Sequence, residues 1–182
     1  DYQAQTPWEA AEEFPAFVGE RKKGYDAVTL LANSIGAFFS MNALNEKLVD
    51  NALLISPVVD MEQLITNMMR WSEVTEAELE ERREIPTDFG ETLSWDYLCY
   101  VRRHPIRWSV PTCILYGQRD GLTPYETISA FAKGIHAPLT VMEGGEHWFH
   151  TSEQMAFLDR WVVESMACLS EGETQTAATA TL

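Results

Sequence analysis

Cationic side chains are scarce in this sequence. Its 182 residues hold 13 lysines and arginines against 28 aspartates and glutamates, which gives a formal net charge of −15. Because nucleic acid and anionic membrane surfaces repel acidic proteins, this balance disfavours both as partners. Long apolar runs are missing too, since none approaches the roughly 20 residues that a membrane-spanning helix needs. No secretory signal peptide is visible.

Cysteine is also sparse. Cys99, Cys113 and Cys168 are an odd number and lack the spacing of metal ligands, so they are typical of free thiols. Free thiols fit a reducing compartment, and we therefore expect a cytoplasmic protein. The hydrophobic fraction of 46% and the charged fraction of 23% are ordinary for a soluble globular chain. The length suffices for one domain with a hydrophobic core.

Short apolar runs alternate with helical patterns along the chain. Strands buried on both faces are predicted at 26–32, 51–58, 111–117 and 138–142. Helices are predicted at 7–21, 35–44, 123–134 and 151–166. This alternation favours the α/β class, in which right-handed crossovers build a parallel sheet flanked by helices. We expect this core to span residues 1–168, and the small polar residues of 169–182 predict a disordered tail.

One connection is too long for a simple crossover. Residues 60–110 contain three helical patterns, "DMEQLITNMMRW", "TEAELEERRE" and "SWDYLCYVRRH". We expect a helical insertion there, acting as a lid over one end of the sheet. The segment "MMRW" (68–71) either lines an acyl pocket or belongs to the core, and the acidic run fits a solvated helix face.

Ser34 interrupts the stretch "LLANSIGAFFS", where a predicted strand ends and a helix begins. Its side chain should project from the carboxyl edge of the sheet, where open α/β folds bind ligands. A tight turn needs small neighbours, which Ala32 and Gly36 supply. The backbone N–H of Ile35, at the start of the helix, could donate to an oxyanion. The pattern fits a nucleophile elbow with alanine in place of the first glycine, although a serine that merely caps a helix looks the same.

A serine nucleophile needs a base, and that base needs an orienting acid. Asp120 follows the third predicted strand, and His147 follows the fourth. Either residue alone could be an ordinary loop residue at the surface. Together with Ser34 they share one edge of the sheet and have the chain order Ser, Asp, His.

Four other residues compete for these roles or look similar. His150 is a rival base, and Asp60, after the second predicted strand, is a rival acid. His104 and His136 follow helical segments and are expected at the surface.

The segment 26–162 resembles the carboxyl-terminal half of an α/β-hydrolase. The stretches "ANSIGA", "LYGQRDGLTP" and "GGEHWF" resemble the elbow, the acid loop and the histidine loop of that family. The resemblance implies Ser34 as nucleophile, Asp120 as acid and His147 as base, with an oxyanion donor at Ile35. A serine nucleophile implies an esterase-like role rather than a dehalogenase or epoxide hydrolase.

The expected function is therefore hydrolysis of a carboxylic ester or thioester through an acyl-enzyme, with a small acyl compound as substrate and no metal or organic cofactor. An acyltransferase or peptidase would use the same three residues, and a hydrolase-like binding protein would not turn over. An α/β-hydrolase normally has several strands before the elbow strand, whereas only one helix is predicted there. We therefore expect either a missing amino-terminal segment or a partner chain that completes the sheet.

Overall fold

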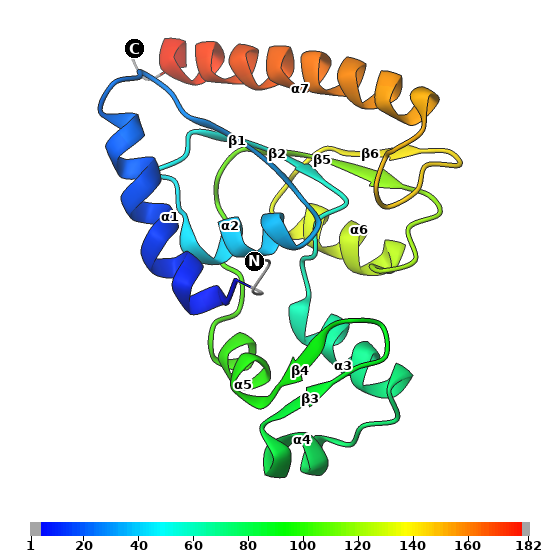
Figure 1. Ribbon diagram of the computed structural model, residues 1–182. Helices are drawn as coiled ribbons and strands as arrows, with labels where there is room; N and C mark the ends of the chain where they lie inside the picture. The colour runs from blue at the N-terminus through cyan, green and yellow to red at the C-terminus, as the bar shows by residue number, and fades with distance from the viewer. Residues whose placement is uncertain (1–4, 180–182) are drawn as a thin grey trace.

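A parallel sheet of four strands forms the centre of the protein (Figure 1). The computed structural model describes residues 5–179, and it describes side chains as far as residue 170. The strand order is β1–β2–β5–β6, and every neighbouring pair is parallel. The strands are β1 (Thr29–Asn33), β2 (Asn51–Ile55), β5 (Thr112–Gly117) and β6 (Leu139–Met142). The predicted α/β class is thus confirmed, and each strand overlaps a predicted one.

Helices cover both faces of this sheet (Figure 1). Two helices pack on one face, a third helix crosses the opposite face, and α1 lies beside α2. The helices are α1 (Pro7–Lys22), α2 (Ser34–Ala43) and α6 (Tyr125–Gly134) on the first side, and α7 (Ser152–Thr179) on the other. The sheet is thus the middle one of three layers.

Alternation along the central strand β2 explains the two layers of core. Ala52 and Leu54 pack toward α2 and α6, while Leu53 and Ile55 pack toward α7. All five residues of this strand are buried, as expected for a strand covered on both faces. Burial on both faces is what produces a continuous apolar run instead of an alternating one.

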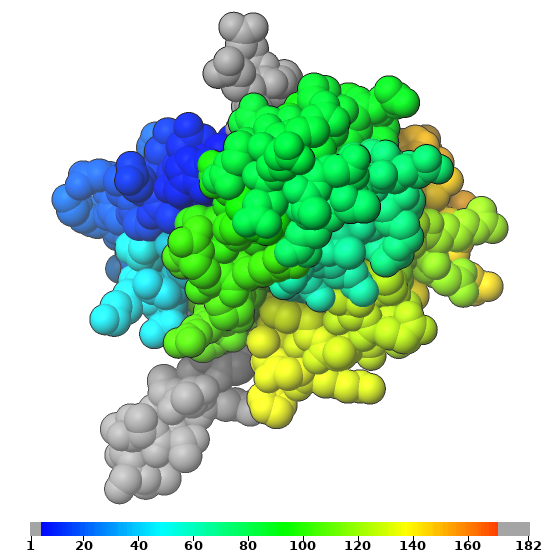
Figure 2. All heavy atoms as spheres, turned by 90° about the horizontal axis from the view of Figure 1, so that it is seen from below, coloured from blue at the N-terminus to red at the C-terminus, as the bar shows by residue number. Residues whose placement is uncertain are grey.

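Residues between β2 and β5 form a second lobe, on the α2 and α6 side of the sheet (Figure 1). Figure 2 views this side, with the lobe in green covering the middle of the molecule. Its elements are α3 (Met61–Trp71), α4 (Glu76–Arg82), β3 (Glu84–Pro86), β4 (Thr92–Ser94) and α5 (Trp95–Arg103). We call this lobe the insertion.

The insertion contains a helix in each of the three segments with a helical pattern, and between α4 and α5 it also contains a short hairpin that was not predicted. Strands β3 and β4 pair antiparallel, with Ile85 opposite Leu93. Pro86 cannot continue a helix, and Gly90 adopts a φ of 92°, which favours a turn between two short strands. Ile85 and Leu93 are buried, so the hairpin adds an apolar layer to the insertion.

The core of the insertion includes part of the sheet lobe. Phe38 and Phe39 of α2 belong to the same buried cluster as Ile65 and Met69 of α3. Their two rings lie 5.7 Å apart, centroid to centroid. The helix that begins at Ser34 is therefore packed against the sheet on one side and against the insertion on the other.

Helix α7 extends further than the sequence predicted. It continues to Thr179, past residue 168, where we expected the folded part to end. Adding a residue to an existing helix costs much less than starting one, so a long helix can run into a weakly helical segment. Residues 180–182 lie outside the described range. Along 5–179, no helix combines the length and the apolar character that crossing a lipid bilayer requires.

Strand β1 lies at the edge of the four-stranded sheet and pairs only with β2. Its residue Leu31 is 57% exposed, while its neighbours Leu30 and Ala32 pack toward α2. An apolar edge strand is a site for pairing with another chain. The expectation that a further segment or partner completes the sheet stays a prediction.

Replacing Leu31 by lysine is expected to increase the monomeric fraction of the 182-residue chain, because charged side chains on an edge strand oppose strand addition. Size-exclusion chromatography across a concentration series measures this fraction. The matched control is Val163→Lys, which places the same charge on α7 at a residue that is 69% exposed. If both substitutions raised the monomeric fraction equally, the cause would be the change in net charge and not the loss of pairing at strand β1.

Candidate active site

The turn between β1 and α2 holds Ser34 in an unusual backbone conformation. Its φ is 49°, in the left-handed region that side chains other than glycine rarely occupy. Such strain costs on the order of 1–3 kcal/mol and is typical of functional sites. The adjacent Ile35 is the second residue of α2, where a backbone N–H has no acceptor within the helix. Ser34 and Ile35 both line the same pocket.

Gly36 was expected to be small because the turn at Ser34 is tight, but the described residues around it leave room for a side chain. A Cβ atom built at Gly36 would meet nothing within 4 Å. The tightness of the turn instead appears in the φ of Ser34 itself.

His147 connects the serine to a carboxylate. Its Nε2 lies 2.7 Å from Ser34 Oγ, and its Nδ1 lies 2.7 Å from Asp120 Oδ2. In this arrangement Nδ1–H donates to the carboxylate, which leaves Nε2 free to accept the serine proton. The structure thus brings together three residues that are 27 and 113 positions apart in the sequence.

Asp120 is held by the loop that follows β5. Its Oδ1 accepts from the backbone N–H groups of Leu122 (2.9 Å) and Thr123 (3.3 Å), and its side chain is fully buried. Burial alone would raise the pKa of Asp120, but the hydrogen bonds from His147 and from the Leu122 N–H outweigh it. The net pKa of this carboxyl is therefore lowered. Asp120 stays ionised and can stabilise a positive charge on the imidazole.

Backbone N–H groups donate hydrogen bonds between the loop that carries Asp120 and the loop that carries His147. The N–H of Arg119 donates to Gly145 O at 2.8 Å, and the N–H of Gly144 donates to Gln118 Oε1 at 3.0 Å. At Gly117 the approach is so close that a Cβ atom would lie 2.7 Å from Gly145 O. Gly117 is not among the site residues predicted from the sequence. Its position at the end of a buried strand, just before the acid loop, was the available signal.

Replacing Gly117 by alanine is expected to lower kcat about 100-fold, because the loop with His147 must shift to accommodate the new methyl group. A displacement of about 1 Å costs roughly this factor when catalytic groups must be aligned. Steady-state ester hydrolysis measures the change. Gly134→Ala, at the end of α6, is the control, since a Cβ there meets nothing within 4 Å. Wild-type kcat in Gly117→Ala would show that the close approach is unimportant.

The rival residues lie elsewhere. His150 is exposed and its Nδ1 faces Glu146 at 3.3 Å. Asp60 caps α3, where its Oδ1 accepts from the Gln63 N–H at 2.8 Å. His104 stacks on Tyr100, and His136 is exposed at the end of the α6 segment. None of these four side chains is hydrogen-bonded to Ser34 or to His147.

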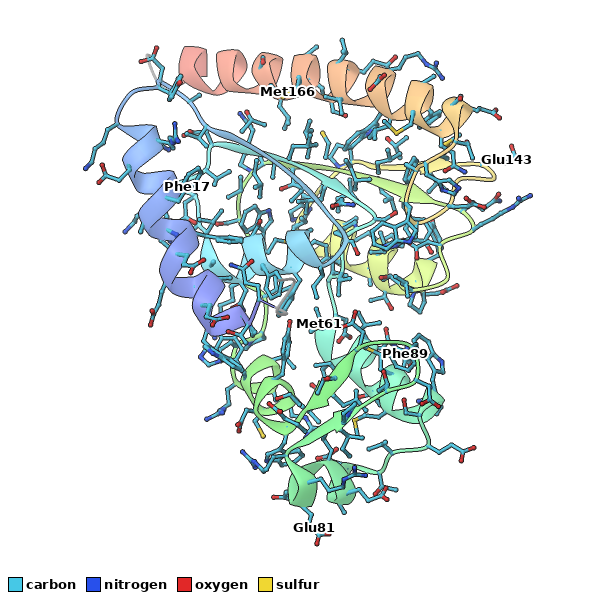
Figure 3. All side chains as sticks on the ribbon, in the orientation of Figure 1. Phe17, Met61, Glu81, Phe89, Glu143 and Met166 are labelled. Atoms are coloured by element: carbon cyan, nitrogen blue, oxygen red, sulfur yellow. The ribbon has the colours of Figure 1, made fainter. Side chains whose placement is uncertain are left out.

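A pocket of about 330 Å³ lies between Ser34 and the insertion. Figure 3 labels Met61 and Phe89, which line it, on the side of the insertion that faces the sheet lobe. The segment 68–71 both lines the pocket and contributes to the core. Met68 and Trp71 line the pocket, whereas Met69 is buried in the core. The lining is mostly apolar: Gln5, Ser34, Ile35, Val58, Met61, Leu64, Ile65, Met68, Trp71, Phe89, Glu91, Thr92, Leu93, Ser94, Tyr97, Leu122 and Trp148. The volume falls within the range of small-molecule sites.

Comparisons with known proteins found no matching family model and no matching curated protein. Solved structures do match. Est1E from Butyrivibrio proteoclasticus has a TM-score of 0.69 at 18% identity, over 90% of this chain and 72% of that one. Alpha/beta hydrolase domain-containing protein 10 from mouse has a TM-score of 0.72 at 14% identity, over 93% of this chain and 72% of that one.

A third similar structure is the monoacylglycerol lipase of Paleococcus ferrophilus. Its TM-score is 0.60 at 16% identity, over 91% of this chain and 76% of that one. At these identities the likeness concerns the fold. The chain therefore has the α/β-hydrolase fold, as the resemblance in the sequence implied.

Proposed function

We propose that this chain, which has the α/β-hydrolase fold, is a serine hydrolase that cleaves a carboxylic ester or thioester through an acyl-enzyme. The observation that carries the proposal is the pair of 2.7 Å contacts that link Ser34 to His147 and His147 to Asp120, at the edge of an apolar pocket. The solved structures with this fold include an esterase and a lipase by name, which supports the same class.

Acylation starts when His147 accepts the hydroxyl proton of Ser34 and Oγ attacks the acyl carbonyl. The tetrahedral oxyanion that forms accepts a hydrogen bond from the Ile35 N–H, a type of contact worth about 3 kcal/mol in the transition state. Asp120 stabilises the imidazolium. The imidazolium then gives its proton to the leaving alcohol or thiol, and the acyl group stays on Oγ.

Deacylation repeats these steps with water as the nucleophile. His147 takes a proton from the water as the water oxygen attacks the acyl carbon, and the resulting imidazolium gives that proton to Ser34 Oγ as the tetrahedral intermediate collapses. The carboxylic acid leaves. Each step uses only the side chains named here, so we expect no requirement for a metal or an organic cofactor.

The pocket sets the size of the substrate group that enters it. A volume of about 330 Å³ lies at the small end of the range for small-molecule sites. This fits a small molecule with a medium acyl or aryl group. One solved structure of Est1E contains bound ferulic acid, a compound in this size range.

Labelling with a fluorophosphonate probe tests the proposal, because such probes react only with an activated serine. We expect one modification per chain, located at Ser34 by peptide mass spectrometry. Hydrolysis of p-nitrophenyl esters of graded chain length then reports turnover. Absence of both labelling and turnover would favour a hydrolase-like binding protein instead.

A further inference from the structure

We propose that the pocket beside Ser34 takes the positively charged end of a cationic ester, such as an ester of a quaternary ammonium alcohol. The inference rests on the proposed function, because it names a substrate class for the same site. Three features of the pocket carry it: its single charge, its exposed aromatic rings and the acidity of the protein around it.

Glu91 supplies the single charge. It lies in the turn before β4, and among the residues that line the pocket in the described chain it is the only charged one. No lysine, arginine or histidine lines the pocket there. The carboxylate of Glu91 also takes part in no hydrogen bond or ion pair with any described residue. A bound cation would pair with this carboxylate, whereas a bound anion would be repelled by it.

Aromatic rings surround the same space. Trp71, Phe89 and Trp148 line the pocket and are 54%, 47% and 65% exposed. The rings of Trp71 and Phe89 meet edge to face, with centroids 6.2 Å apart and an interplanar angle of 80°. Aromatic faces attract ammonium groups, and cages of such rings bind quaternary ammonium ligands.

No cationic side chain of the described protein occupies these rings. The cation–π contacts within the described residues are Arg21 over Phe17 and Arg160 over Phe157, both outside the pocket. Trp148 also meets the ring of His147 edge to face, with centroids 4.9 Å apart, so Trp71 and Phe89 are the pocket rings farther from the catalytic histidine that can receive a cation.

The remainder of the pocket suits the uncharged part of such a substrate. Met61, Leu64 and Ile65 form an apolar wall on α3. The formal net charge of −15 adds a long-range field that concentrates cations near the protein and repels anions. The binding of an amphipathic cation is therefore favoured by three contributions. The negative field attracts it, the aromatic rings and Glu91 contact its charged group, and the apolar wall contacts its uncharged part.

Three butyrate esters of nearly equal shape test the inference. Butyrylcholine is the cation, 3,3-dimethylbutyl butyrate is its neutral isostere, and 2-sulfoethyl butyrate is an anion. At low ionic strength we expect kcat/KM for butyrylcholine to exceed that of the neutral isostere about 3- to 20-fold, and the anion to be poorer than both. Added salt should shrink the difference. A second series, with p-nitrophenyl 4-(trimethylammonio)butyrate and p-nitrophenyl 5,5-dimethylhexanoate, places the charge on the acyl side.

Variants separate a local effect from the effect of net charge. Glu91→Gln is expected to reduce the cation-to-neutral ratio about two- to fivefold, and Trp71→Leu should reduce it similarly. The matched control is Glu81→Gln, which removes the same charge from the far end of the insertion (Figure 3). This control should leave the ratio unchanged.

The outcomes distinguish this inference from the proposed function. Turnover of the neutral ester without a cation preference in either series would overturn the inference and leave the serine hydrolase intact. Equal effects of Glu91→Gln and Glu81→Gln would overturn it as well. Failure of Ser34 to react with a neutral fluorophosphonate, together with no turnover of any ester, would instead overturn the proposed function.

Discussion

Replacing Ser34 by alanine is expected to lower kcat for ester hydrolysis by a factor of about 10⁴–10⁶, the range seen when the nucleophile of a serine triad is removed. The Ser34 Oγ–His147 Nε2 contact of 2.7 Å is the geometry that proton transfer needs. Alanine keeps the backbone and loses only the hydroxyl, so thermal unfolding should change little. Initial rates with p-nitrophenyl butyrate and a thermal melt measure the two quantities.

The matched control is Ser40→Ala, on the same helix α2. Ser40 is buried, yet it does not line the pocket. This variant should retain most of the activity. If Ser34→Ala kept its turnover, or if both serines were equally sensitive, Ser34 would not be the nucleophile.

Replacing Asp120 by asparagine should reduce kcat by about 10⁴-fold. The amide oxygen of asparagine can still accept from the Leu122 N–H, as Oδ1 does in the wild type. Its NH₂ group then faces His147 Nδ1, which must become an acceptor. The proton moves to Nε2, and Nε2 can no longer accept the proton of Ser34. Steady-state kinetics of the purified variant measures the loss.

Asp60→Asn is the control for this prediction. Asp60 caps α3 through the Gln63 N–H, and asparagine caps a helix about as well as aspartate does. Both activity and stability should therefore stay near wild type. A larger loss of activity in Asp60→Asn than in Asp120→Asn would place the acid after β2 instead of after β5.

The sequence allowed the sheet and the Ser34–His147–Asp120 cluster to be predicted for a simple reason. Parallel strands bring their carboxyl ends to one edge, so a residue just after each apolar run has a known position. Ser34, Asp120 and His147 each follow such a run, and the structure joins them. The same rule does not exclude Asp60, which also follows a predicted strand, and only the structure shows that Asp60 caps α3 while His150 faces Glu146.

Features that depend on contacts between distant segments could not be predicted. The steric role of Gly117 arises from the carbonyl of Gly145, which lies in the loop after the neighbouring strand β6. The β3–β4 hairpin is made of two three-residue strands, too short for a periodic pattern. The composition of the pocket depends on how the insertion folds back over Ser34, which no local pattern reports.

The position of Phe38 and Phe39 also limits how this protein can be re-engineered. Both rings lie on the helix that starts at the nucleophile, and both are buried in the core of the insertion. Cutting out the insertion would expose them to water, at a cost of roughly 1.5–3 kcal/mol for each fully exposed side chain. The insertion is therefore not an exchangeable module. A chimaera carrying the insertion of another hydrolase would have to import matching residues for α2 along with it.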